Sequence, residues 1–460
     1  MNSNSAQFRN ILGITKEVRE ASPLNFGDSI VNTLYFHSEA IAGRAVKKSG
    51  RYFDWDMTLD NILTSPFTGI PIMLLLLGIL FWVTLVGANY PSQLLSNLFF
   101  GIEKQLSALF VSFGAPDWLY GIAILGMFRT FAWVVAVMLP PMAIFFPLFT
   151  FLEDLGYLPR VAFNLDRMFK AAGSHGKQAL TMSMGFGCNA AGVTACRIID
   201  SPRERLIAII TNNFVPCNGR FPTLILLATI FLGTGAAGQL KASAAVVSLV
   251  LVGIGTTLLV SYFLSKTALK GIPSTFTLEL PPYRKPQLGR ILVRSFLDRT
   301  LFVLKRAIVV AVPAGAVVWL LANIIIKGQP LISILSGWLE PVAGPMGMDG
   351  VILLAFFLGL PANEIVVPII LMSYLSAGAL LELGTAQSLG QLLLDNGWTW
   401  ATALSVMLFS LLHFPCATTL WTIKAETNSW KWTAFTAGLT TAIACLVCFI
   451  VHQTISFFFL

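Results

Sequence analysis

The sequence predicts an all-α polytopic membrane protein. Of its 460 residues, 56% are hydrophobic and only 11% are charged, and the mean hydropathy is +0.76. A soluble core does not require that much apolar surface. Apolar runs of about 20 residues, the length that crosses a bilayer, recur from residue 69 to the C-terminus. Together these observations exclude a soluble enzyme built around one core.

Basic residues gather beside the apolar runs rather than on one exposed face. They cluster at 44–51, 160–205 and 266–306, whereas 88–118 and 232–242 carry one lysine each. This positive-inside pattern places the three clusters and the N-terminus in the cytoplasm, and it predicts outward loops at the other two ranges. It gives no reason to expect a nucleic-acid partner. The polar N-terminal stretch also lacks the features of a signal peptide.

The chain divides into four parts. Residues 1–60 mix charged and apolar positions, which is typical of short amphipathic helices, and are predicted to form a cytoplasmic helical extension. A first membrane half (61–267) and a second (305–460) flank a basic, proline-containing cytoplasmic connector (268–304). The expected spanning segments are 69–88, 119–151 with an interruption at Pro140 and Pro141, 204–232, 243–265, 305–326, 399–422 and 434–459.

Two further apolar segments contain helix-breaking residues. Residues 177–197 hold the sequence GFGCN, and 348–372 centre on GLPANE. Broken backbone at membrane depth is tolerated only where protein or a wet cavity satisfies the freed N–H and C=O groups. Both segments are therefore predicted to be broken or re-entrant helices. Paired breaks of this kind mark transporter substrate sites near the bilayer midplane.

The two halves look like repeats of opposite orientation. Val-Pro-Cys at 215–217 follows the first break, and Phe-Pro-Cys at 414–416 follows the second. Residues 373–398 contain acidic but no basic side chains, while 423–432 carry two lysines, so the second half is predicted to run opposite to the first. An inverted repeat places the C-terminus outside. A plain count of eight helices places it inside, and the sequence leaves both open.

Cysteines stand at three of these positions. Cys188 is followed by Asn189, and a soft thiolate with a harder amide oxygen suits a borderline divalent ion such as Fe²⁺. Cys217 and Cys416 each follow a proline, whose missing N–H frees a carbonyl one turn earlier in the helix. The alternative is that the cysteines are small apolar packing residues.

Three polar residues of the second half are further candidates. His413 lies three residues before Cys416, hence on the same face of a continuous helix, and is either a metal ligand or an interhelical hydrogen-bonding group. Glu364 would cost about 3 kcal/mol at the bilayer centre, which favours a cation ligand or a proton carrier. The alternative is a cap on the half-helix after Pro361. Asn363 offers another hard oxygen ligand.

Short motifs then connect the chain to a known family. They are LEDLGY at 152–157, LDR at 165–167, GSHGK at 173–177, GFGCN at 185–189, ELPPYR at 279–284, and Pro415-Cys416 followed by Glu426 and WKW at 430–432. In order and spacing they resemble the membrane domain of the ferrous iron transporter FeoB family, over about residues 60–440. The resemblance implies two Gate-type halves, the family's name for its paired apolar segments, in a bacterial plasma (inner) membrane. It implies Fe²⁺ as the transported substrate, with Mn²⁺, Zn²⁺ or Co²⁺ as alternatives and no bound cofactor.

The resemblance also sets expectations about partners. The family's N-terminal GTP-binding domain is absent from these 460 residues, and no G-x-x-x-x-G-K-[ST] loop occurs. The chain itself is therefore not expected to be an enzyme, and GTP-linked gating would need a separate small GTPase subunit. A small accessory protein, membrane lipid and further copies of the chain are the other expected partners. The chain departs from the family at Ala190-Ala191, at His413 and at Asn-Gly-Arg (218–220), which leaves the choice of metal open.

The leading hypothesis is a midplane metal path lined by Cys188, Asn189, Cys217, Asn363, Glu364, His413 and Cys416. A nucleoside or other small-solute transporter would use a stacking aromatic such as Phe186 or Trp421, but it has no use for three cysteines. A Gate-domain membrane assembly protein without transport would need neither Glu364 nor the paired Pro-Cys breaks.

Overall fold

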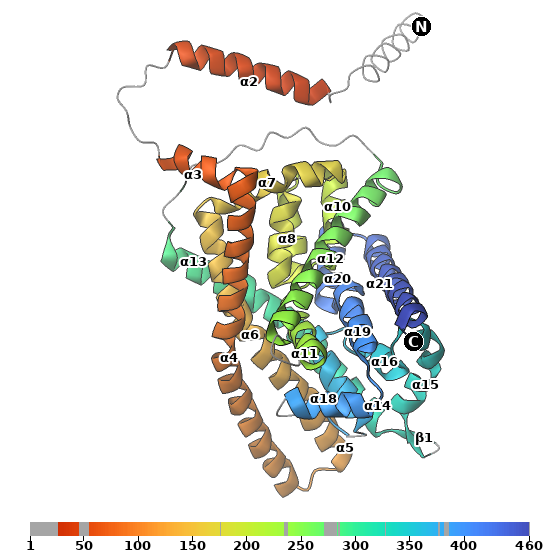
Figure 1. Cartoon of the computed structure of the whole chain (residues 1–460). Helices are drawn as coiled ribbons and strands as arrows, with labels where there is room; N and C mark the ends of the chain where they lie inside the picture. The colour runs from red at the N-terminus through yellow and green to blue at the C-terminus, as the bar shows by residue number, and fades with distance from the viewer. Residues whose placement is uncertain are drawn as a thin grey trace, which may run out of the picture.

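The fold is a bundle of helices, as predicted (Figure 1). The computed structural model describes residues 26–45, 55–174, 176–233, 238–270, 283, 286–326, 328–375, 378–380 and 386–459. Within these ranges six helices are long and apolar enough to cross a bilayer, or seven if the bent pair Leu331–Met346 and Gly350–Leu358 is one span. The six are Phe67–Ser112, Asp117–Asp154, Leu240–Lys266, Leu288–Asn323, Trp400–Thr427 and Trp430–Phe458.

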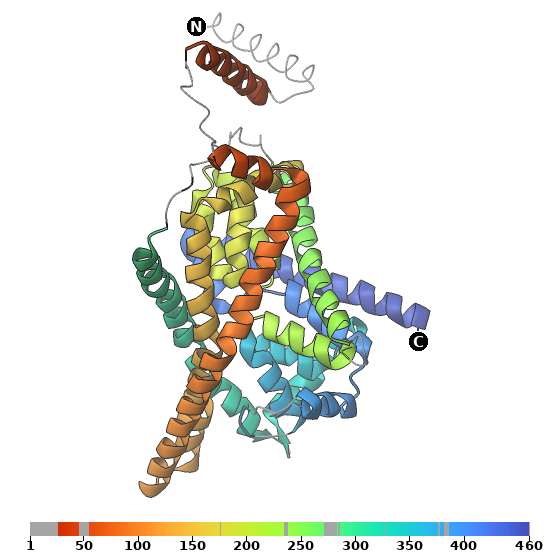
Figure 2. The same ribbon diagram turned by 60° about the vertical axis from the view of Figure 1, so that its left-hand side comes forward.

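The N-terminal helices are α2 (Phe26–Ala45), α3 (Trp55–Leu63) and α4 (Pro66–Ser112). With 47 residues at about 1.5 Å each, α4 is about 70 Å long, more than twice the thickness of a bilayer core. The predicted loop over 88–118 is therefore wrong, since helix continues to the end of α4. Two polar side chains there have partners on the following helix. The Tyr120 hydroxyl donates to Ser107 (3.2 Å), and Arg129 pairs with Glu103. Figure 2 shows the end of α4 and the start of the following helix projecting beyond the rest of the bundle.

The next span joins α5 (Asp117–Tyr120), the π-helical η1 (Gly121–Phe128) and α6 (Arg129–Asp154). The predicted interruption at Pro140 and Pro141 is absent, because α6 runs through both prolines. The fixed φ of proline fits a helix, and neighbouring groups in a membrane bundle can take up the carbonyls that it frees.

After α7 (Tyr157–Ala171), the chain enters the bundle and turns back. α8 (Gln178–Gly187) leads inward, and α9 (Asn189–Ala195) with η2 (Cys196–Ile198) leads out again. Between them Cys188 is extended, with φ −157° and ψ 125°.

Contacts at the two ends of this segment show that it is a re-entrant hairpin. Lys177, at the start, donates to the Ile198 carbonyl (3.1 Å) and pairs with Asp200 (2.8 Å). The two arms lie close because Gly185 and Gly192 both face the Asn212 amide, where an added Cβ would approach within 3 Å. The hairpin therefore enters and leaves at the end of the molecule that carries α3 and α7, here called the α7 end (Figure 1).

The first half closes with α10 (Pro202–Thr211), η3 (Asn212–Phe214), α11 (Phe221–Leu232) and α12 (Gly238–Lys266). The prediction of one unbroken span over 204–232 is wrong, because the chain leaves helical geometry between η3 and α11. Pro216 lies in this break and has no N–H with which to continue the helix.

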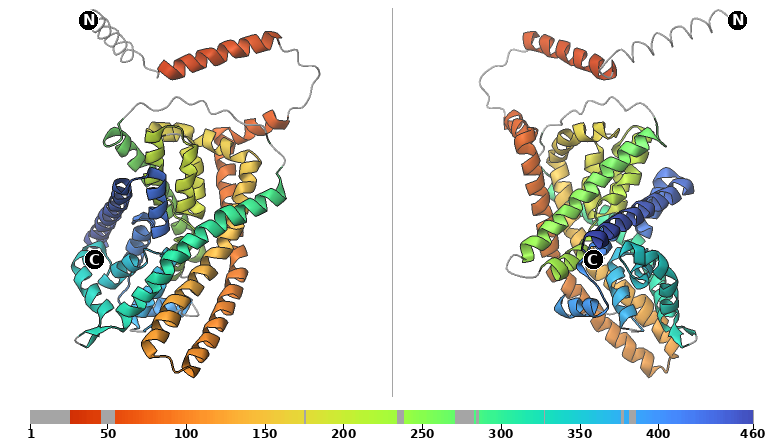
Figure 3. Two further views of the ribbon diagram at one scale, coloured as in Figure 1. Left: turned by 180° about the vertical axis from the view of Figure 1, so that it is seen from behind. Right: turned by 45° about the vertical axis from the view of Figure 1, so that its right-hand side comes forward.

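The second half opens with one long helix across the back of the bundle (Figure 3), built from α13 (Leu288–Arg294), the π-helical η4 (Ser295–Leu301) and α14 (Phe302–Asn323). It begins within the range predicted as the connector. The other elements are β1 (Ile325–Ile326) paired antiparallel with β2 (Gln329–Pro330), α15 (Leu331–Ala343), η5 (Gly344–Met346), α16 (Gly350–Leu358), η6 (Asn363–Ile365), α17 (Val366–Tyr374), α18 (Ala386–Asp395), α19 (Trp400–Leu412), α20 (Ala417–Thr427) and α21 (Trp430–Phe459).

The segment from α16 to α17 is a second re-entrant hairpin, as the sequence predicts. Its turn at 359–362 ends in an extended Ala362, with φ −153° and ψ 122°, almost the same backbone angles as Cys188. Its two ends meet where the Tyr374 hydroxyl donates to the Asp349 carboxylate, and Trp398 donates to the same hydroxyl (2.9 Å). This hairpin enters from the opposite end of the molecule, near α18 and here called the α18 end (Figure 1).

The other two broken segments run antiparallel. The first passes from α10 to α11, and its far end packs at the α18 end, where Phe231 stacks on Trp398 (6.1 Å between ring centroids). The second passes from α19 to α20, and its far end returns to the α7 end, where Glu426 pairs with Arg197 (2.8 Å). Two hairpins from opposite ends and two antiparallel broken segments form the arrangement of an inverted repeat.

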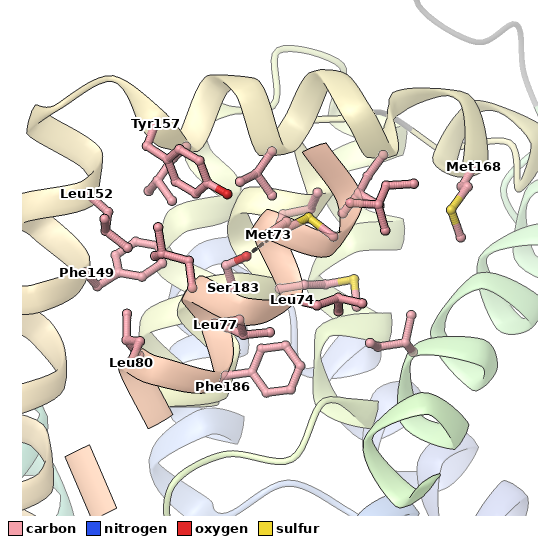
Figure 4. Close-up of a pocket in the computed structure, with 18 of the residues that line it drawn as sticks. Met73, Leu74, Leu77, Leu80, Phe149, Leu152, Tyr157, Met168, Ser183 and Phe186 are labelled. Carbon is pink, nitrogen blue, oxygen red and sulfur yellow. Dashed lines mark hydrogen bonds between the residues drawn. The ribbon is translucent and has the colours of Figure 1, made fainter. Parts of the chain in front are cut away.

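An apolar cavity of about 270 Å³ lies behind the first hairpin, between α4, α6, α7, α8 and α12 (Figure 4). Its wall is apolar, with three methionines among aliphatic and aromatic side chains, and the only hydroxyl groups among the lining side chains that the structure describes are those of Tyr157 and Ser183. Phe186 of α8 and Phe145 of α6 are part of that wall. The Phe145 ring lies against Gly187, where an added Cβ would approach it to 2.2 Å, so aromatic packing holds the inner end of α8 in place.

Candidate functional site

The four breaks meet at one cavity of about 30 Å³, large enough for a single ion or water molecule. It lies between the two hairpin turns and the two Pro-Cys breaks. The residues around it are Met138, Met142, Gly187, Cys188, Asn189, Cys217, Asn218, Gly219, Val303, Ala307, Pro361, Ala362, Asn363, Glu364, Cys416, Thr418 and Thr419.

Equivalent backbone hydrogen bonds hold the breaks together in both halves. In the first half the Asn218 N–H donates to the Gly187 carbonyl (3.4 Å). In the second the Ala417 N–H donates to the Leu360 carbonyl (2.8 Å). Each bond joins a hairpin turn to the residue after a Pro-Cys pair, so the freed backbone groups satisfy one another inside the protein, as membrane depth requires.

Five sulfur-containing residues line the cavity. Three are the predicted Cys188, Cys217 and Cys416, of which the first two are buried. The other two are Met138 and Met142, which the sequence analysis missed. Their spacing of four residues puts them on one face of α6, but that signal is common in apolar helices and drew no attention. Thioether sulfur is a soft ligand like thiolate.

Amide and hydroxyl oxygens supply the harder donors. The Asn363 amide oxygen is buried and accepts no hydrogen bond, and the buried Thr418 hydroxyl has no partner either. With its nitrogen turned to the carbonyls, Asn189 donates to Gly185 (3.1 Å) and Val215 (3.2 Å). Unpartnered oxygens in a buried cavity are costly, and a bound cation would compensate them.

Glu364 begins the returning arm of the second hairpin and lies against Gly219 of the first half. A Cβ at Gly219 would approach the Glu364 carboxylate oxygen to 2.3 Å. The carboxylate also sits in the first turn after the extended Ala362, where the positive end of a helix favours an anion. The ligand and cap interpretations of Glu364 are therefore both compatible with its position.

His413 is the one predicted site residue that does not line the cavity. It ends α19, and its Nδ1 lies 2.9 Å from the Phe409 carbonyl and 3.0 Å from the Ser410 carbonyl. Its ring is stacked on that of Phe409. The prediction that it shares a helix face with Cys416 is wrong, because the chain leaves the helix between them.

The lining does not amount to a rigid metal cluster. Across the part of the chain that the structure describes, no three His, Cys, Asp or Glu side chains are grouped as a preformed metal centre. Mixed sulfur and oxygen donors spread around a small cavity would give an ion weak contacts rather than a fixed coordination site.

A second cavity, of about 260 Å³, adjoins the first. The two share Val303 and Thr418, which form the partition between them. Its wall also carries Arg299, paired with Glu153 (3.0 Å), and Arg306, whose guanidinium donates to Thr422 (2.9 Å).

Comparison with protein families agrees with this architecture. Residues 135–231 and 304–430 match the Gate family, described as nucleoside recognition, and so cover the hairpins and the broken segments of both halves. Residues 246–298 match the ferrous iron transport protein B C-terminal family. No solved structure matches the chain.

Curated relatives cover most of the chain. The Fe(2+) transporter FeoB of Staphylococcus aureus (strain COL) is 29% identical over 86% of this chain and 58% of its own length. That of Methanocaldococcus jannaschii is 27% identical over 92% of this chain and 62% of its own length. The Fe(2+) transport protein A/Fe(2+) transporter FeoB fusion protein of Porphyromonas gingivalis is 25% identical over 87% of this chain and 52% of its own length. The chain thus spans about three fifths or less of these relatives. The two Gate segments, with the FeoB C-terminal segment between them, together cover more than half of the chain, which belongs to the family of FeoB membrane domains.

Proposed function

We propose that this chain carries ferrous iron across the membrane through the 30 Å³ cavity, with the ion as transported substrate. The observation that carries the proposal is the donor set at the meeting point of the four breaks. Three thiols, from Cys188, Cys217 and Cys416, stand with the oxygens of Asn363 and Glu364. Soft and hard donors together suit a borderline divalent ion such as Fe²⁺.

The names of the relatives support the choice of ion. The Staphylococcus and Methanocaldococcus proteins are both named Fe(2+) transporters. Mn²⁺, Zn²⁺ and Co²⁺ accept similar donors and are the competing substrates to test.

The size of the cavity argues against a nucleoside. Pockets that bind organic ligands have volumes of roughly 300–1,000 Å³. That is about ten times the volume of the cavity at the four breaks or more. Neither of the stacking aromatics considered above, Phe186 and Trp421, lines this cavity, and Trp421 is exposed.

The 260 Å³ cavity is the proposed way out. It begins beyond Val303 and Thr418 and is lined by Ile198 of η2, which lies at the α7 end. An ion that leaves the site toward that end would pass between these two residues into the larger cavity. The positive-inside pattern supports a cytoplasmic α7 end and N-terminus, so this direction is uptake.

We place the energy source outside these residues. The chain offers no phosphate-binding loop, so a separate GTP-binding unit is the proposed gating partner. The Porphyromonas relative, a fusion with Fe(2+) transport protein A, supports a small accessory protein as a second partner.

Uptake of Fe²⁺ into vesicles that contain the purified chain tests the proposal. Cys188→Ser, Cys217→Ser and Cys416→Ser should each lower uptake about tenfold or more, because serine keeps the volume but is a harder and far less acidic donor. Cys445→Ser, in α21 and outside the cavity lining, is the matched control and should transport like the wild type. Wild-type uptake by the triple variant would refute the ligand role and leave the cysteines as packing residues.

A further inference from the structure

Arg220 is a buried cation that does not line the cavity of the proposed transport path. Its side chain is fully buried, between the 215–220 break and α11. Among the residues that the structure describes, no carboxylate forms an ion pair with it. A buried charge without a counter-charge is strongly destabilising unless other groups compensate it.

Four backbone carbonyls provide that compensation. Nη1 donates to the carbonyls of Asn213 (2.9 Å) and Leu411 (2.7 Å). Nη2 donates to those of His413 (3.1 Å) and Phe414 (3.3 Å). Of the guanidinium nitrogens only Nε is buried without a partner.

These carbonyls come from both halves of the inverted repeat. Asn213 is in η3, at the first broken segment, and the other three are at the end of α19, at the second. The end of a helix carries partial negative charge on its free carbonyls, which attracts a cation. In transporters with broken helices, unwound carbonyls and half-helix C-termini coordinate a free cation such as Na⁺.

We propose that the crossing of the two broken segments is a cation-binding cage of four carbonyl oxygens, which Arg220 fills as a tethered cation in place of a free ion. The guanidinium suits this task because its donors form a rigid planar fork that reaches both segments at once. The cage would accept a free guanidinium ion, or an alkali cation, once the side chain is removed.

The cage also holds Cys217 and Cys416 in position at the cavity. Arg220 lies three residues after Cys217, and two of its acceptors, His413 and Phe414, lie directly before Pro415-Cys416. The guanidinium therefore holds the two Pro-Cys breaks at a set separation, with both thiols on the same cavity. This makes Arg220 a positioning residue, and the part of the inference that concerns metal binding rests on the proposed function.

Chemical rescue tests the cage. Purified Arg220→Ala should have a lowered melting temperature, and millimolar guanidinium chloride should raise it again. Urea, a neutral molecule of nearly the same shape, should not, and potassium chloride in a parallel arm tests for an alkali cation. The matched control is Arg197→Ala, which removes an exposed arginine paired with Glu426 and leaves no buried cage, so its melting temperature should not respond to guanidinium.

A spectroscopic measurement tests the positioning role. Co²⁺ bound to thiolates gives a charge-transfer absorption, and its affinity in Arg220→Ala should fall about tenfold and recover with guanidinium. Arg220→Lys should fold but bind Co²⁺ more weakly than the wild type, because one ammonium cannot reach both segments.

The outcomes separate the cage from the transport proposal. If the wild type binds no Co²⁺ through thiolates, the metal site fails, while guanidinium-dependent melting of Arg220→Ala still establishes the cage. Wild-type melting in Arg220→Ala, or equal rescue by urea, would overturn the cage. Should Arg220→Ala fail to fold even with guanidinium, the lysine variant decides: wild-type Co²⁺ affinity contradicts the positioning role, and weaker affinity supports it.

Discussion

Gly219 of the first half lies against Glu364 of the second, so a substitution of Gly219 tests whether the position of the Glu364 carboxylate matters. A Cβ at Gly219 would lie 2.3 Å from the Glu364 carboxylate, so Gly219→Ala must push that carboxylate away from its place at the cavity. We expect Fe²⁺ uptake to fall about tenfold, which corresponds to about 1.4 kcal/mol in a barrier. Gly438→Ala in α21 is the control, because an added Cβ there meets nothing within 4 Å. Equal uptake by the two variants would show that the carboxylate position is unimportant.

Glu364→Gln separates a ligand from a cap. If the carboxylate binds the ion or carries protons, the amide loses the charge that offsets a desolvated divalent cation, and uptake should fall at least about tenfold. If Glu364 is only a cap, the loss is about 0.3–1 kcal/mol of stability, and uptake stays normal. Uptake in vesicles and the melting temperature of the same preparation distinguish the two. We expect the first result.

Met138 and Met142 should set how strongly soft ions compete with iron. Replacing both with leucine keeps similar volume but removes two soft sulfur donors from the cavity. We expect Cd²⁺, a thiophilic ion, to inhibit Fe²⁺ uptake less strongly in the double variant, while inhibition by Mn²⁺ changes little. Unchanged Cd²⁺ inhibition would indicate that the thioethers serve only as packing.

At the scale of elements, the sequence predicted the hairpins better than the broken segments. Glycine, proline and asparagine at 185–189 and 359–364 mark both hairpin turns, because several such residues close together weaken a helix more than one proline does. The break at 215–220 was only partly predicted, since Pro216 was expected to free a carbonyl within a span that otherwise continues over 204–232. His413 was misplaced for a related reason: the residues before Pro415 are driven out of helical geometry, so helical spacing no longer applies.

The positive charge of Arg220 did not by itself predict the structural role of this residue. Three of its four acceptors are backbone carbonyls from a segment about 190 residues away, and a carbonyl has no signature in sequence. The polar candidates were easier to find: all of them except His413 line the cavity, because cysteines, asparagines and a carboxylate in apolar segments are rare enough to stand out. The apolar lining residues, Met138 and Met142 among them, have no such signal.

A cluster outside the spanning helices ties the connector to the α7 end. The Tyr283 hydroxyl donates to Asp60 of α3 (2.8 Å), and the buried Arg160 of α7 pairs with the same carboxylate (3.0 Å) while lying over the tyrosine ring. Burial raises the pKa of Asp60, but the hydrogen bonds from Arg160 and Tyr283 outweigh it and hold that pKa below its ordinary value. Burial and the bond to Asp60 raise the pKa of Tyr283 to about 12.

These two pKa shifts predict the pH range over which the connector stays attached to the α7 end. The depressed pKa of Asp60 contributes stability above its ordinary value near 4, and this is lost as pH falls through the lower folded value. The raised pKa of Tyr283 contributes stability below pH 10, which is lost as pH rises toward about 12. Protease cleavage of the connector should therefore be slow between these limits and faster outside them. Tyr283→Phe should remove the alkaline transition, and its persistence would contradict the assignment.

At the scale of the whole molecule, the two hairpins enter from opposite ends. We therefore expect the α7 end and the α18 end to face opposite sides of the membrane. In a background without native cysteines, Asp200→Cys at the α7 end should react with an impermeant thiol reagent only after permeabilisation. Asp395→Cys at the α18 end should react in intact cells. Both positions reacting from one side would contradict the inverted repeat.

The two hairpins also bear on how the membrane voltage would act on a transported ion. Because each reaches the 30 Å³ cavity from its own end, the proposed ion path crosses the protein where the two turns meet. A doubly charged ion that crosses the whole membrane voltage gains about 4.6 kcal/mol per 100 mV. If water reaches the turns from both ends, that energy acts within one short step of the proposed path, and the current through the path should rise steeply with voltage.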